Sequence, residues 1–149
     1  MEIQLKTLSP KDVVDFVQLI QIFEDVFELD DLEIPPNSHL ENLLSQSNFL
    51  VLVATTKGKV VGGLTVHLLS SYYSLKPTAY IYDVGIKPAY QRKGIGKRLI
   101  TYLTQYCKNN GFKEAYVEAE TDDQQAVNFY RKTQASSEME ATHFTYWIN

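Results

Sequence analysis

A glycine-containing turn with basic neighbours is the first stretch of this 149-residue sequence that could do chemistry. It reads Gln91-x-x-Gly94-x-Gly96, and it lies between a predicted strand at residues 80–86 and a predicted helix that starts at Gly94. The first N–H groups of a helix have no partner inside the helix, so they can bind an anion. Four basic side chains surround the turn, namely Arg92, Lys93, Lys97 and Arg98. The pattern predicts a site for a phosphate-bearing ligand.

Two common phosphate loops do not fit this turn. A Walker A loop would need glycine in place of Gln91, and a dinucleotide fingerprint would need glycine in place of Leu99. The pattern that remains resembles the pyrophosphate-binding motif of the GNAT superfamily of N-acetyltransferases, which bind acetyl-CoA. The resemblance implies that the amides from 92 to 97 receive the pyrophosphate. The implied cofactor residues here are Gln91, Arg92, Lys93, Gly94, Ile95, Gly96 and Lys97.

The same resemblance assigns a role to the strand before the turn. In that superfamily the strands that match 80–86 and 115–119 splay apart, and the pantetheine arm of the cofactor pairs with the first like an added strand. Carried over to this sequence, Val84, Gly85 and Ile86 would contact the arm. The Val84 N–H would also stabilise the oxyanion that develops on the thioester.

A second superfamily signature lies at residues 123–130. It resembles Asn-x-x-Ala-x-x-Phe-Tyr, with Asp123 in place of the usual Asn, and it implies cofactor contacts from Asp123, Ala126 and Phe129. In relatives the tyrosine that matches Tyr130 protonates the departing thiolate, and a phenol is able to do this. The alternative is that Tyr130 only packs. Relatives usually have Gly-Phe shortly after this signature. This sequence instead has Lys-Thr-Gln-Ala at residues 132–135.

A carboxylate is needed to accept a proton from an amine acceptor. An alkylamine has a pKa of about 10.4 and is therefore mostly protonated at neutral pH. Asp83 is a charge within an apolar strand, so it either meets a structural partner or faces a cavity, and we favour the cavity. Strict alternation would place Tyr80, Tyr82, Val84 and Ile86 on the face opposite Asp83. Glu118 and Glu120 on the following strand remain alternative bases.

Three local features narrow the resemblance to the gentamicin-type aminoglycoside 3-N-acetyltransferases of the superfamily. They are Ile20-x-Ile22-Phe23-x-x-x-Phe27, Tyr80-Ile81-Tyr82-Asp83 and the late His143-Phe144. Aminoglycosides are polycations, which suits the acidic residues at the end of the first predicted helix. The residues implied for the acceptor are Glu24, Asp25, Glu28, Tyr82 and His143. A solvated acidic face is the alternative interpretation of the acidic group.

Composition sets the remaining limits. Apolar residues make up 44% and charged residues 21%, which is typical of one globular domain, here predicted over 1–149. We find neither a signal peptide nor a membrane-spanning run. The single Cys107 is predicted to pack in the core and fits a cytoplasmic location. His39, His67 and His143 show no ligand spacing, so no metal is expected, and the net charge of −4 favours a cationic partner over nucleic acid.

Hydrophobic periodicity predicts ten elements in the order β-α-α-β-β-β-α-β-α-β. Strands are expected at 2–7, 49–55, 60–69, 80–86, 115–119 and 138–148. The third of them, 60–69, carries Gly62 and Gly63 as signs of a bulge or a close approach. This order predicts an α/β fold with a mixed, mostly antiparallel sheet and helices on both faces. The GNAT superfamily has the same order.

The sequence therefore predicts an acetyl-CoA-dependent N-acetyltransferase that acts by direct attack in a ternary complex. The predicted acceptor is a primary amine of a cationic small molecule, with Asp83, Tyr130 and Glu120 as catalytic residues. Two alternatives stay open: transfer to another amine (a polyamine, an amino acid or a protein lysine or N-terminus), and a non-catalytic acetyl-CoA sensor. A homodimer is expected by analogy with relatives.

Overall fold

The computed structural model describes residues 1–149, which form two compact units at 1–118 and 119–149. The helices of both are too short or too polar to cross a membrane.

The first unit is built on one five-stranded sheet with the order β1-β2-β3-β4-β5. The strands are β1 (Gln4–Thr7), β2 (Phe49–Thr56), β3 (Lys59–Leu69), β4 (Thr78–Ile86) and β5 (Glu114–Val117). The first four strands pair antiparallel, and β5 pairs parallel with β4. The predicted mixed, mostly antiparallel sheet is therefore confirmed.

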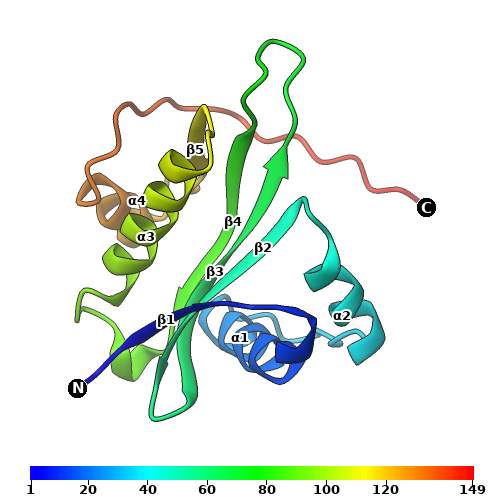
Figure 1. Cartoon of the computed structure of the whole chain (residues 1–149). Coiled ribbons are helices and arrows are strands. Elements are labelled where there is room, and N and C mark those ends of the chain that lie inside the picture. Colours follow the sequence, from blue (N-terminus) through cyan, green and yellow to red (C-terminus); the bar gives the residue numbers. More distant parts are fainter. The chain divides into compact units, whose positions relative to one another are not determined.

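Helices cover both faces of this sheet (Figure 1). On one face lie α1 (Val13–Val26) and α2 (Asn37–Ser45), which share a buried cluster with Val51 and Val53 of β2. On the other lies α3 (Ile95–Asn109), whose buried side chains recur at helical spacing. Cys107 belongs to that buried stripe with an exposed fraction of 5%, as the sequence predicted.

Two glycines allow α1 to lie close against the sheet. A Cβ on Gly63 would lie 2.6 Å from the Leu52 carbonyl oxygen and 2.8 Å from Leu19 Cδ1, so no side chain fits there. A Cβ on Gly85 of β4 would lie 2.8 Å from Phe23 Cδ1. Gly63 thus marks the close approach that the sequence predicted. A Cβ on Gly62 would instead lie 2.9 Å from the Gly85 carbonyl oxygen of β4, and β3 has a register shift beside Gly62.

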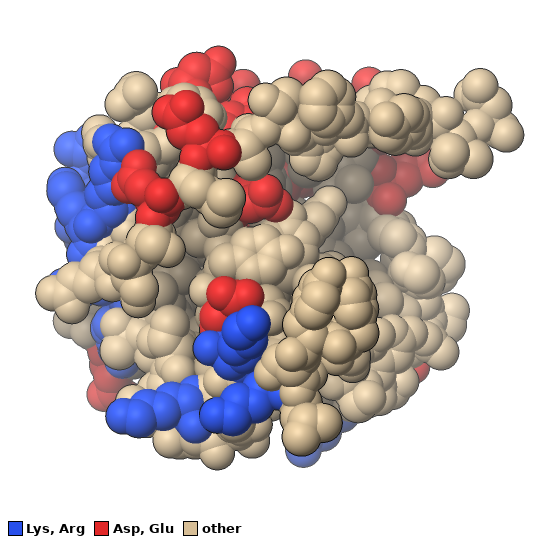
Figure 2. Space-filling view, turned by 90° about the horizontal axis from the view of Figure 1, so that it is seen from above, with Lys and Arg blue, Asp and Glu red and all other residues tan.

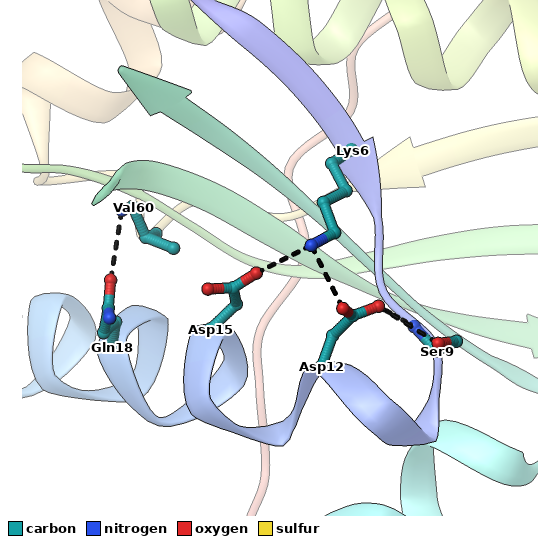
Figure 3. Close-up of polar contacts among 6 residues, drawn as sticks. All are labelled: Lys6, Ser9, Asp12, Asp15, Gln18 and Val60. Carbon is teal, nitrogen blue, oxygen red and sulfur yellow. Dashed lines mark hydrogen bonds and ion pairs between the residues drawn. The ribbon is translucent and has the colours of Figure 1, made fainter. Parts of the chain in front are cut away.

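Polar contacts attach the start of α1 to β1. The Asp12 carboxylate accepts hydrogen bonds from the Ser9 N–H at 2.9 Å and the Ser9 hydroxyl at 3.0 Å. Lys6 of β1 lies between Asp12 and Asp15, at 3.0 and 2.9 Å (Figure 3). One turn later the Gln18 side chain accepts a hydrogen bond from the Val60 N–H at 3.1 Å. These contacts fix the direction in which α1 crosses the sheet.

The second unit contains α4 (Gln124–Arg131) and a long irregular segment. The Asp123 side chain caps α4 by accepting from the Ala126 N–H at 3.1 Å. The strand predicted at 138–148 is wrong, since no strand is formed there. A strand needs a hydrogen-bonded neighbour, and no strand of the chain pairs with this segment. Its apolar side chains, Phe144, Trp147 and Ile148, are accordingly 76%, 85% and 92% exposed.

Candidate active site

The predicted splay between the two strands exists in the sheet. β4 pairs with β5 only from Thr78 to Ile81, because β5 ends at Val117 while β4 continues to Ile86. Residues 82–86 therefore have no neighbouring strand on that side. Their backbone groups are available to a ligand that pairs with an edge, which is the arrangement that an extended chain needs.

A bulge in β4 changes which residues share a face. Thr65 pairs with Asp83 and Val66 with Ile81, so Tyr82 is the extra residue. Thr65 and His67 lie on one face of β3, and their partners Asp83 and Tyr80 must share that face. The predicted separation of Asp83 from Tyr80 and Tyr82 is therefore wrong, because a bulge interrupts strict alternation.

Asp83 is half-buried on the α1 face of the sheet. Its N–H donates to the Thr65 hydroxyl at 3.3 Å, and no basic side chain forms an ion pair with its carboxylate. Burial raises the pKa of this carboxyl group above its ordinary value, and the nearby His67 acts weakly in the opposite direction. The structure thus offers a partly desolvated carboxylate without an ion-pair partner.

The turn before α3 has the backbone of an anion site. Gly94 is the N-cap of α3 with φ of 83°, and Arg92 also has a positive φ of 61°. The Gln91 side chain donates to the Ile86 carbonyl oxygen at 2.9 Å, which ties the turn to the end of β4. Arg98 is engaged elsewhere, because it donates to the Ile3 carbonyl oxygen at 3.2 Å. Arg92, Lys93 and Lys97 remain exposed beside the helix start.

The C-terminal end of α1 carries an acidic hollow. It is lined by Glu24, Asp25, Glu28, Leu29 and Asp30. No basic residue occupies the last turn of α1, although the negative end of a helix dipole favours cations. Phe23 packs on Gly85, so this helix end lies beside β4 near Asp83. A cation bound there would relieve unfavourable electrostatics in the free protein.

Sequence reasoning assigned no role to Tyr80, Tyr116 and His67. The Tyr80 and Tyr116 rings stack with centroids 4.7 Å apart, and His67 lies edge-on to Tyr82 at 5.4 Å. The Tyr80 hydroxyl donates to Glu118 at 2.9 Å, and burial and this carboxylate raise the pKa of Tyr80 to about 12. Strand register brings these side chains together, and the linear sequence contains no direct signal of register.

The other predicted residues lie in the second unit. Tyr130 is half-buried on α4, and its ring meets that of Phe129 at 5.0 Å. Ala126 lies on the same helix behind the Asp123 cap. Glu120 precedes α4, His143 belongs to the irregular segment, and both are exposed. No contact in the structure tests their predicted roles.

The charge of the molecule is unevenly spread. Figure 2 looks onto the end of the sheet that carries the 70–77 loop, and most of the face is uncharged. Figure 2 shows the Lys and Arg side chains in blue and the Asp and Glu side chains in red among these uncharged side chains.

Comparison with known proteins gives consistent matches. A family model described as "Acetyltransferase (GNAT) family" matches residues 16–135. The N-alpha-acetyltransferase RimI of Mycobacterium tuberculosis is 32% identical over 98 residues, which are 65% of this chain and 58% of that protein. Across three curated relatives, the matched regions span 13%, 58% and 46% of the relatives' lengths.

Solved structures match over almost the whole chain. The aminoglycoside acetyltransferase meta-AAC0020, from an uncultured soil metagenomic sample and solved with trehalose and with sisomicin, has a TM-score of 0.97 and 44% identity. The match covers 99% of this chain and 97% of that chain. The aminoglycoside acetyltransferase HMB0005, also from soil metagenomic DNA, has a TM-score of 0.92 and 27% identity, with full coverage of both chains.

Proposed function

The chain belongs to the acetyltransferase (GNAT) family, and on that premise we propose that it transfers an acetyl group from acetyl-CoA to a primary amine of an aminoglycoside. The position that we propose is the 3-amino group. The observation that carries the proposal is Asp83, a half-buried carboxylate without an ion-pair partner at the point where β4 loses its neighbour β5. The 44% identity to a protein solved with sisomicin supports the choice of acceptor.

The residues around α3 fit acetyl-CoA. The helix start offers free N–H groups, Gly94 leaves open space within 4 Å of a Cβ position, and three exposed cations flank it. The free edge at 82–86 fits the extended pantetheine arm. We assign the pyrophosphate to Gln91–Lys97, the arm to Val84, Gly85 and Ile86, and further contacts to Asp123, Ala126 and Phe129.

The chemistry assigned to this chain has three parts. When bound, acetyl-CoA supplies a thioester carbonyl that an amine can attack. Asp83 attracts the acceptor's ammonium group and takes its proton, which frees the nitrogen lone pair, and its raised pKa makes it a stronger base than an exposed aspartate. The Val84 N–H donates to the oxygen on which charge develops. The Tyr130 hydroxyl donates a proton to the departing sulfur.

The acidic hollow is the proposed docking site for the acceptor's other ammonium groups. Glu24, Asp25 and Glu28 gather there at the negative end of α1, where no basic side chain balances them. Tyr82 lies on the same face as Asp83, and we assign it and His143 to the acceptor as well.

A second candidate acceptor is the N-terminal amine of a protein. The 32% identity to an N-alpha-acetyltransferase over 98 residues favours it. A peptide N-terminus carries one charge, however, and would use little of the acidic hollow.

The deciding experiment measures release of the coenzyme A thiol with a panel of acceptors. We expect gentamicin to accelerate release well above spermidine and above an alanine-initiated peptide, and mass spectrometry to find one acetyl group on the 3-amino nitrogen. Turnover of the peptide alone would replace the first candidate by the second. Acetyl-CoA binding without turnover of any amine would favour the sensor.

We also propose that the chain forms a homodimer through its C-terminal segment. Phe144, Tyr146, Trp147 and Ile148 expose at least 76% of their surface each, and such apolar exposure is typical of protein contacts.

A further inference from the structure

A row of aromatic side chains crosses the sheet on the face of Asp83. Strand register places Phe49 beside His67, His67 beside Tyr80, and Tyr80 beside Tyr116. The ring centroids of Phe49 and His67 lie 5.2 Å apart, and those of Tyr80 and Tyr116 lie 4.7 Å apart. We call these four side chains, together with Tyr82, the aromatic row. It runs over β2, β3, β4 and β5.

The bulge in β4 completes the row. As the extra residue, Tyr82 lies edge-on to both His67 and Tyr80, with centroids 5.4 and 5.7 Å away. The same bulge turns Asp83 onto this face, opposite Thr65. The proposed base and the rings therefore belong to one surface, which regular alternation would have divided.

The two ends of the row differ in exposure. At the β2 end, Phe49 packs against Phe16 of α1 with centroids 6.1 Å apart, so α1 covers this end. Toward β5, Tyr82 is 57% exposed and Tyr116 is 40% exposed. Exposed rings so close to a functional carboxylate are a binding feature rather than part of a closed core.

Carboxylates accompany the exposed rings. Glu118 accepts the Tyr80 hydroxyl at 2.9 Å, and Asp83 lies next to Tyr82 in the strand. A purely apolar partner would remove water from both carboxylates without pairing them, which is costly. The matching face of a second copy would bring the same two carboxylates and would leave them unpaired as well. A ligand that fits must offer an apolar face for the rings and cationic groups for the carboxylates.

We propose that Tyr82 and Tyr116, the exposed end of the aromatic row, bind a saturated amino-sugar or aminocyclitol ring of the acceptor by stacking, and so select ring-bearing polyamines over linear ones. This inference rests on the proposed function. The C–H face of such a ring lies on the tyrosines, while its ammonium groups meet Asp83 and Glu118. A linear polyamine satisfies the carboxylates but leaves the rings without contact.

The test replaces Tyr116 by Leu, which keeps an apolar side chain and removes the ring. We expect the KM for gentamicin to rise about tenfold, the KM for spermidine to change less than twofold, and the KM for acetyl-CoA to stay constant. Tyr116→Phe should retain the gentamicin KM. Tyr73→Leu is the control, because Tyr73 lies in the 70–77 loop, is 85% exposed and has its ring against Tyr72, and it should change none of the three.

Three outcomes would overturn the inference. The first is that Tyr116→Leu leaves the gentamicin KM unchanged. The second is that the KM values for gentamicin and spermidine rise equally. The third is that the variant loses a dimer on sedimentation while its gentamicin KM stays unchanged, which would make the row a subunit contact. If Tyr116→Leu does not fold, saturation-transfer NMR compares the original protein with Tyr82→Leu. The ring protons of gentamicin should saturate strongly with the original protein and weakly with the variant.

Calorimetric titration with gentamicin separates this inference from the proposed function. Binding that depends on Tyr116 but yields no acetylated product would keep the subsite and reject the acetylation. Acetylation that does not depend on Tyr116 would keep the function and reject the subsite.

Discussion

At the scale of single residues, Asp83 combines three properties that a general base needs. It is half-buried, it has no ion-pair partner, and burial raises the pKa of its carboxyl group. Glu118 differs, since it already accepts the Tyr80 hydroxyl at 2.9 Å, and Glu120 is exposed. Among the three candidate bases, Asp83 therefore has the most favourable surroundings for taking a proton from an ammonium group.

Replacing Asp83 by Asn should lower kcat/KM for the amine by about 100-fold to 10,000-fold, since a general base contributes that range. In the unmodified enzyme, the acidic limb of the pH–rate profile should fall at a pH above the ordinary aspartate value of about 3.9, because the pKa is raised. Glu118→Gln and Glu120→Gln are the charge-matched controls. A greater loss in either control would move the role of base to that residue.

The raised pKa of Asp83 also predicts a stability effect. A carboxyl group whose pKa is higher in the folded state favours folding when it is protonated and opposes it when it is ionised. Asp83→Asn should therefore increase the free energy of unfolding at pH 7. That gain should vanish as the pH falls below the unfolded value of about 3.9, as urea titrations at both pH values would reveal. A gain independent of pH would contradict the assignment to ionisation.

Tyr130→Phe should reduce kcat by about tenfold and leave both KM values nearly unchanged, since the phenol donates a proton only as the sulfur departs. A thiolate with a pKa near 8.5 is a good leaving group, which keeps the loss at the lower end of the range for proton transfer. Tyr146→Phe, which is 83% exposed in the same unit, is the control. Equal rates in the Tyr130 variant and the original would leave only a packing role.

At the scale of elements, the two helix ends near β4 have opposite electrostatics. The start of α3 presents free N–H groups and exposed cations to a phosphate, while the end of α1 gathers carboxylates at the negative end of its dipole. A phosphate at the start of α3 would interact favourably with the dipole of α3, whereas the carboxylates of the acidic hollow interact unfavourably with the dipole of α1. Stability alone would not favour the second arrangement, so a cationic ligand is its best explanation.

Gly94→Ala should raise the KM for acetyl-CoA by at least tenfold and cost about 1 kcal/mol of stability, because Gly94 has φ of 83°. Gly111→Ala is a matched control at the other end of α3, with φ of 72° and likewise nothing within 4 Å of a Cβ. It should show the same loss of stability with an unchanged KM. If both variants have the same KM for acetyl-CoA, the assignment of the phosphate to Gly94 is wrong.

Asp25→Asn should raise the gentamicin KM about threefold and increase the free energy of unfolding by about 0.5 kcal/mol, since it removes a charge at the unfavourable helix end. The change in KM should shrink at high salt, where exposed charges are screened. Glu41→Gln, an exposed charge change on α2, should leave the KM unaltered. A solvated acidic face without a binding role would give the same KM in both variants.

At the scale of the whole molecule, the C-terminal segment lacks a pairing strand and a buried environment for its apolar side chains. Its sequence has strand character, yet no strand forms there, and Trp147 is 85% exposed. An unpaired segment of this composition is suited to pairing with another chain. A second copy would then supply the hydrogen-bonded neighbour that this segment lacks within its own chain.

Light scattering after size exclusion should therefore give twice the chain mass of 17.1 kDa. Trp147→Ser should shift the mass toward that of one chain, because it removes the largest exposed apolar side chain of the segment. Tyr73→Ser, also 85% exposed but in the 70–77 loop, should leave the mass unchanged. A single-chain mass for the original protein would reject the dimer.

The elements and the cofactor motif were predictable from the sequence because both depend on neighbours along the chain. Apolar periodicity identified the strands β1 to β5 and the four helices, and Gly94 with its basic neighbours marked the start of α3. The caps at Ser9 and Asp123 depend on local residue types in the same way.

The face of the sheet that carries Asp83 was decided only by tertiary structure. A single extra residue at Tyr82 places Asp83 on the same face as Tyr80, and strand register adds Tyr116 and His67 from sequence positions far away. The missing C-terminal strand has the same cause, because pairing requires a partner and composition expresses only propensity. Short-range periodicity contains neither bulges nor register, which depend on how separate strands pack.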